Sequence, residues 1–112
     1  MELLGHPLTI EEINNLRKTF GDYLKLTVDI EKECLVAGGE LHADGEKLLL
    51  KEGSNQDNIW GGGINLKDKQ IDAAAILNLR PRLENDNLEI LDPQRRERFF
   101  SVVKRIFQKL WL

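Results

Sequence analysis

The sequence predicts a single α+β domain, with three helices packed mainly on one face of a four-stranded, mostly antiparallel sheet. The chain has 112 residues, of which 41% are hydrophobic and 31% charged, a size and composition that suit one domain with its own core. Apolar residues recur at helical spacing near both ends, and two pairs of segments between them alternate with a period of two. The predicted domain covers residues 1–112, in the order helix, hairpin, short helix, hairpin, helix.

The first predicted helix covers residues 10–20. Thr9 and Glu12 have the spacing of a capping box, in which each side chain accepts a hydrogen bond from the main-chain N–H of the other residue. Gly21 provides a stop signal at the end of the helix. We expect the apolar side of this helix to pack on the sheet; it carries Ile10, Ile13, Leu16 and Phe20.

Two β-hairpins are predicted from alternating apolar and polar residues. The first joins a strand over 23–30 to a strand over 35–42, and Asp44 is then expected to cap a short helix that ends at Gly53. The second joins 59–66 to 71–79. The glycines at 61–63 interrupt its first strand, which indicates either a bulge or a close approach of the backbone to another group.

A long helix is predicted at the C-terminal end, after a polar, acidic and mobile loop over 82–91 that would be either a lid or a simple connection. Asp92 and Pro93 are typical of a helix start, and we expect the helix to run to about residue 109. Its apolar side spans about half of its circumference, more than one sheet face requires. The surplus suggests a homodimer formed through this face, which carries Phe99, Phe100, Val102, Val103, Ile106, Phe107, Leu110 and Trp111.

The N-terminal residues include no basic segment and no apolar run of the kind found in a signal peptide, and no apolar stretch approaches the ~20 residues of a membrane helix. Cys34 is the single cysteine, which fits a reducing cytoplasm. We therefore predict a cytoplasmic protein without a membrane partner. Residues 93–112 carry a net charge of plus five against minus eight for the rest, so a basic-helix interface with nucleic acid is disfavoured but not excluded.

In each predicted strand the apolar residues point to one face of the sheet. The opposite face is the predicted site, an open surface for a protein partner or an anionic small ligand. It would gather Thr27, Asp29, Glu40, His42, Asn65, Asn78 and Arg80. The position of Asn65 depends on whether the glycines form a bulge, because a bulge would turn its side chain to the other face.

Glu40, His42 and Asp44 are candidate metal ligands, with Glu40 and His42 also candidate catalytic groups. On an extended strand, residues two apart point to the same side, and imidazole and carboxylate groups together bind divalent ions. This supports an alternative function as a metal-assisted hydrolase or nuclease. We favour the plainer interpretation, in which Asp44 caps its helix and the other two form local hydrogen bonds. No motif identifies a cofactor, and the sequence does not decide whether the protein is an enzyme.

A second candidate group consists of arginines around the loop over 82–91, namely Arg80, Arg82, Arg95 and Arg96. Arginine in the first turn of a helix opposes the helix dipole, so the last two require compensation from loop carboxylates or from a bound anion, and we favour the carboxylates. Trp60 is either a core residue or a stacking platform for a ligand ring, and the core is the favoured alternative.

Several segments resemble a family of small bacterial proteins described as a domain of unknown function. They are Gly38-Gly39-Glu40-Leu41-His42-Ala43-Asp44, Gly53-Ser54-Asn55-Gln56, Asn78-Leu79-Arg80-Pro81 and Asp92-Pro93. The chain departs from that pattern at the glycines 61–63 and in the acidic segment after Arg82. The resemblance implies a bacterial, cytoplasmic protein and brings no activity with it.

Overall fold

The structure is a computed structural model that describes all 112 residues. It is an α+β fold with three α-helices and one antiparallel sheet, as predicted, but the sheet has five strands and not four. The strands follow the order β1-β3-β2-β4-β5 across the sheet. The elements are β1 (Glu2–Leu4), α1 (Ile10–Phe20), β2 (Tyr23–Asp29), β3 (Cys34–Ala37), α2 (His42–Lys51), β4 (Ile59–Asn65), β5 (Ile71–Asp72) and α3 (Pro93–Ile106).

The added strand is β1, which pairs with β3 at one edge of the sheet. It was missed because it is three residues long and only Leu4 is buried, so no alternation marks it. At the opposite edge, β5 ends at Asp72, whereas the alternation had predicted a strand to Leu79. The chain instead forms short 3-10 helices over Ile76–Asn78 (η2) and Pro81–Leu83 (η3).

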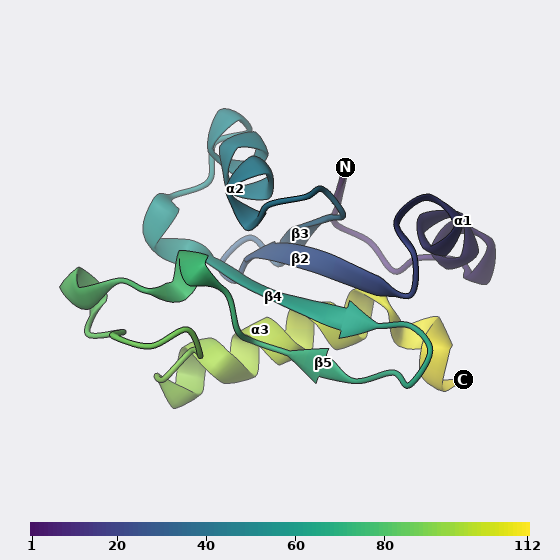
Figure 1. Ribbon diagram of the computed structural model, residues 1–112. Coiled ribbons are helices and arrows are strands. Elements are labelled where there is room, and N and C mark those ends of the chain that lie inside the picture. Colours follow the sequence, from purple (N-terminus) through teal and green to yellow (C-terminus); the bar gives the residue numbers. More distant parts are fainter.

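The helices lie on both faces of the sheet, so the expectation that they pack mainly on one face is wrong (Figure 1). On the α3 side, Leu24, Leu26 and Val28 of β2 join the main core, to which α1 contributes Ile13 and Leu16. On the α2 side, a smaller core consists of Val36, Leu49 and Ile59. The face predicted to be open carries enough apolar surface of its own to hold a helix.

The three glycines of β4 permit close packing on both sides of an unbroken strand. All seven residues of β4 pair in register with β2, so there is no bulge. A Cβ on Gly62 would overlap the main-chain oxygen of Asp72, and one on Gly61 would lie 3.0 Å from the His42 ring. Close backbone approach is therefore the correct interpretation of this segment.

The segment over 82–91, predicted to be a mobile loop, is fixed to the body of the protein. Asn85 and Ile90 are buried, and two isolated bridges join Ala74 to Glu89 and Arg80 to Asn85. Further along, α3 ends at Ile106 and a 3-10 turn over Gln108–Trp111 (η4) replaces the last predicted turn. No helix is long and apolar enough to cross a membrane.

Candidate functional site

A pocket of about 320 Å³ opens where the start of α2 meets η2, on the α2 side of the sheet. Its walls come from three separate parts of the chain: β2, the first turn of α2 and the 3-10 turn after β5. Most of its lining is apolar. The lining residues are Lys25, Leu41, His42, Ala43, Ile76 and Leu77. We call this feature the α2 pocket.

His42 is the one imidazole in the lining, and its orientation is fixed. It begins α2 instead of lying on a strand, and its Nε2 is 2.7 Å from the carbonyl oxygen of Gly62. That contact requires Nε2 to carry the proton, which leaves Nδ1 as a hydrogen-bond acceptor. Burial lowers the pKa of His42, and the hydrogen bond to Gly62 opposes this effect only in part. The ring is therefore neutral at pH 7.

The rim of the α2 pocket exposes apolar side chains to solvent. Ile76 is 80% exposed and Leu41 is 61% exposed. Two carboxylates, Glu40 and Asp44, lie next to the rim in the sequence, and neither takes part in an ion pair. The ammonium group of Lys25 donates a hydrogen bond to the carbonyl oxygen of Glu40. The lining is thus mostly apolar, with Lys25 as its single charged residue and with Glu40 and Asp44 flanking its α2 residues in the sequence.

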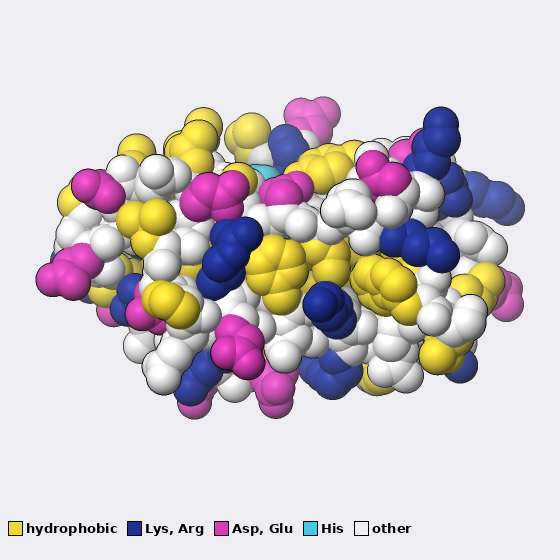
Figure 2. Space-filling model, turned by 90° about the horizontal axis from the view of Figure 1, so that it is seen from below, with side chains coloured by type: hydrophobic (Ala, Val, Ile, Leu, Met, Phe, Trp, Pro, Cys, Tyr) yellow, Lys and Arg dark blue, Asp and Glu magenta, His cyan; other side chains and the backbone are white.

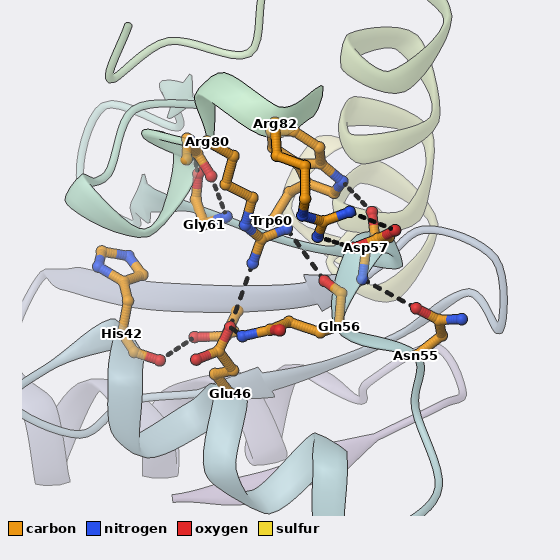
Figure 3. Close-up of polar contacts among 11 residues, drawn as sticks. His42, Glu46, Asn55, Gln56, Asp57, Trp60, Gly61, Arg80 and Arg82 are labelled. Atoms are coloured by element: carbon orange, nitrogen blue, oxygen red, sulfur yellow. Dashed lines mark hydrogen bonds and ion pairs between the residues drawn. The ribbon is translucent and has the colours of Figure 1, made fainter. Parts of the chain in front are cut away.

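Arg80 links the two walls of the α2 pocket. Its guanidinium donates to Glu46 of α2 at 3.1 Å and to the carbonyl oxygen of Gln56 at 3.0 Å, and it lies over the Trp60 ring, 5.0 Å from the centroid (Figure 3). Both members of the Arg80–Glu46 pair are largely buried, and burial lowers the pKa of Arg80. With its donors engaged in this way, Arg80 holds α2 against the segment that carries η2.

Asn78 is the last residue of η2 and is fully buried. Its Oδ1 accepts from the N–H of Gly61 at 2.8 Å, and its Nδ2 donates to the carbonyl oxygens of Gly61, Ala73 and Leu88. The side-chain amide thus makes the two hydrogen bonds with the main chain of Gly61 that a neighbouring strand would make. It does so beyond the point where β5 ends. This arrangement fixes the position of Ile76 at the rim of the pocket.

Three other polar residues predicted on the open face lie on strands: Thr27 is inside β2 and donates to the carbonyl oxygen of His42, and Asp29 and Asn65 end β2 and β4 and accept hydrogen bonds from the turns that follow. Asp29 is buried, and its carboxylate accepts from the N–H groups of Glu31 and Lys32 and from the hydroxyl of Ser54. Asn65 accepts from two N–H groups in the turn after β4. None of the three side chains lines the α2 pocket.

The metal-site candidates are not assembled into a binding group. Glu40 precedes α2, His42 begins it and Asp44 lies in its first turn, while the helix cap is Leu41, which forms no side-chain capping hydrogen bond. The strand geometry that would have aligned them, and the predicted capping role of Asp44, are both wrong. No group of three His, Cys, Asp or Glu side chains in the protein is arranged to hold a metal ion.

The arginine group is paired internally for the most part. Arg96 pairs with the loop carboxylate of Glu89 at 2.9 Å, as predicted, and Arg82 pairs with Asp57 at 2.5 Å. The hydrogen bond from Arg82 lowers the pKa of Asp57. Arg95 lies over the ring of Trp60, which is fully buried, so the core interpretation of this tryptophan is confirmed.

Sequence reasoning missed three residues that shape the site. Asn85 is buried, and its side chain makes four hydrogen bonds that hold the segment over 82–91 in place. Ile76 and Lys25 border the α2 pocket; the alternation placed both on the open face of the sheet, but neither was singled out as a site residue. The sequence does not distinguish a buried asparagine such as Asn85 from an asparagine in an exposed turn. The exposure of Ile76 follows from the 3-10 turn η2, which the alternation of apolar and polar residues did not indicate.

Comparison with known proteins gives one match. A protein-family model described as a protein of unknown function, DUF5674, matches residues 2–106. No curated protein and no solved structure matches the chain significantly. The family match confirms the resemblance to a domain of unknown function.

Proposed function

We propose that this chain, which belongs to the DUF5674 family of proteins of unknown function, is a binding module that captures an apolar side chain of a partner protein in the α2 pocket. The observation that carries the proposal is the exposed rim. Ile76 and Leu41 stand on opposite walls of a mostly apolar hollow and remain largely in solvent. Exposed apolar groups that surround a pocket are typical of a protein interaction site.

A protein partner fits this surface better than a small ligand. A small molecule inside about 320 Å³ would leave both rim side chains in water, whereas a folded or extended segment could cover them as well as the pocket. Lys25 is the single cation of the lining; its ammonium group donates one hydrogen bond to the carbonyl oxygen of Glu40 and keeps its charge, so a small anionic ligand would find one charged partner in a mostly apolar pocket. The free Nδ1 of His42 can accept one hydrogen bond from the partner.

The charge around the pocket indicates the kind of partner segment. Glu40 and Asp44 are unpaired and flank the residues that line the pocket. Because these two carboxylates outnumber Lys25, the single cation of the lining, a segment with an apolar anchor between basic residues would be favoured over one with acidic neighbours. Burial of one leucine side chain contributes ~1.5–3 kcal/mol, so a short peptide should bind weakly, with a Kd on the order of 10 mM.

The test is an NMR titration of the ¹⁵N-labelled protein with two blocked peptides, Ac-Arg-Leu-Leu-Arg-NH₂ and Ac-Glu-Leu-Leu-Glu-NH₂. We expect the basic peptide to shift the amide signals of Leu41, His42, Ala43 and Ile76. The shifts should be lost in the double variant Leu41→Asp, Ile76→Asp. They should persist in the matched double variant Leu3→Asp, Leu91→Asp, which changes two other exposed leucines.

Two results would overturn the proposal. Absence of shifts around the α2 pocket with either peptide would exclude apolar capture there, as would equal shifts in the Leu41→Asp, Ile76→Asp variant. Equal shifts with the acidic and basic peptides would leave apolar capture in place and reject the role of Glu40 and Asp44.

A further inference from the structure

A second surface lies on the opposite face of the molecule, between β5 and α3. A hollow of about 240 Å³ is lined there by Lys69, Gln70, Ile71, Phe100, Lys104 and Trp111. Figure 2 shows this face, on which Lys and Arg side chains lie beside and between hydrophobic side chains across the middle of the molecule. We call the residues that line this hollow the β5–α3 strip. It shares no residue with the α2 pocket.

The aromatic side chains of the strip are accessible to different degrees. Trp111 is 45% exposed, whereas Phe100 is half-buried and packs against the main core. The guanidinium of Arg96 lies over the Phe100 ring, 5.0 Å from its centroid. Trp111 therefore offers an open ring face, and Phe100 forms a wall of the hollow.

The lining of the strip carries two positive charges and no negative one. Lys69 and Lys104 are exposed and form no ion pair. Asp68 and Asp72 are close in the sequence, but neither lines the hollow or forms an ion pair with a lysine; Asp68 accepts a hydrogen bond from the N–H of Gln70, and Asp72 accepts one from the Tyr23 hydroxyl. The strip is thus basic on a chain whose net charge is minus three.

We infer that the β5–α3 strip binds single-stranded nucleic acid, with a base stacked on Trp111 and phosphates held by Lys69 and Lys104. Open aromatic rings beside unpaired cations are the combination that recognises single strands without sequence preference. A second copy of the chain fits less well, since a two-fold contact through this strip would bring the lysines of both copies together. The charge therefore selects an anionic partner over self-association.

The experiment measures fluorescence anisotropy of fluorescein-labelled oligothymidylate and oligouridylate with the whole chain. The double variant Lys69→Glu, Lys104→Glu should weaken binding at least about tenfold. The matched double variant Lys47→Glu, Lys51→Glu reverses two lysines of α2 on the opposite face and should change affinity far less. Trp111→Ala should cost a factor of about 5–150, the equivalent of ~1–3 kcal/mol for one stacked base.

Salt dependence and two parallel arms decide the remaining points. Two phosphate contacts predict a loss of about sevenfold in affinity for a single strand between 50 and 200 mM salt. No anisotropy change, or equal losses in both lysine double variants, would overturn the inference. Binding of phosphatidylserine vesicles without binding of oligonucleotide would assign the strip to an anionic membrane surface, and Trp111-dependent dimerisation in sedimentation without oligonucleotide binding would assign it to a second copy. Both outcomes reject the nucleic-acid assignment and leave the α2 pocket proposal untouched.

Discussion

Substitution of Asn78 should destabilise the protein far more than a change at a surface binding residue would. The buried amide makes four hydrogen bonds, two of them with the main chain of Gly61. A hydrogen bond contributes about 1 kcal/mol net, and each buried partner left unpaired costs about 1–3 kcal/mol. Asn78→Ala should therefore lower the free energy of unfolding by about 3–5 kcal/mol, a large part of the ~5–15 kcal/mol available to a domain.

Urea unfolding followed by circular dichroism measures this loss. The midpoint of Asn78→Ala should fall by at least about 1 M relative to the unmodified protein, with little change in slope. Asn87→Ala is the matched control, since Asn87 is exposed in the following segment and its side chain accepts a single hydrogen bond, from the N–H of Glu89, so its loss should cost no more than about 1 kcal/mol. A loss below ~1 kcal/mol for Asn78→Ala would refute the structural role and return Asn78 to the candidate ligand-binding residues.

Asn78→Asp tests the direction of the hydrogen bonds. A carboxylate can still accept from the N–H of Gly61, but it cannot donate to the three carbonyl oxygens that the amide serves. Burial against those oxygens disfavours the ionised form and should raise the pKa of this carboxyl in the folded state above its unfolded value. The variant should accordingly be unstable at pH 7 and regain stability relative to the unmodified protein as the pH falls through the raised pKa. A constant difference between the two proteins from pH 7 to pH 4 would contradict this account.

Three further predictions concern single positions. The pKa of His42 is lowered in the folded state, so the unfolded chain binds more protons than the folded one as the pH falls below ~6.5. The free energy of unfolding should therefore decrease over that range. It should decrease less for His42→Gln, as measured by thermal unfolding of both proteins at each pH. Gly62→Ala should lower the free energy of unfolding by more than ~2 kcal/mol, because its Cβ would meet the main-chain oxygen of Asp72, and a urea midpoint equal to that of the unmodified protein would show that β4 can shift. Thr9→Ala should cost ~1 kcal/mol through loss of the capping box with Glu12, and a smaller loss when Glu12 is already Ala would confirm that the two side chains act together.

Local sequence signals predicted the elements whose stability is local. The capping box at Thr9 fixes the start of α1, the alternation from Tyr23 fixes β2, and the pair Asp92-Pro93 fixes the start of α3. Each of these signals acts within a few residues along the chain. Their positions in the structure agree with the predicted ones to within a residue at the N-terminal ends.

Errors occurred where contacts distant in sequence decide the structure. Alternation continued past Asp72, but the edge of β4 is completed there by the Asn78 side chain instead of by more strand. His42 was assigned to a strand by its spacing from Glu40, whereas packing of the following residues on β2 makes it the first residue of α2. In both cases a tertiary contact overrode a correct local pattern.

The α2 pocket lies on the face of the sheet that was predicted as the site, but its lining is mostly apolar where polar residues were expected. The predicted face gathered polar residues, and the structure engages Asp29, Asn65 and Asn78 in turns and buried hydrogen bonds, which leaves apolar side chains at the surface. The exposure of Ile76 depends on the bonds of Asn78 in the same turn, so stability and binding are coupled at this point. Asn78→Ala should weaken peptide capture by displacing η2, whereas Ile76→Asp should abolish capture with little change in the urea midpoint. A single variant that lost both stability and peptide capture could not separate the two effects. Asn78→Ala and Ile76→Asp together can, because the Asn78 side chain is buried and the Ile76 side chain is exposed.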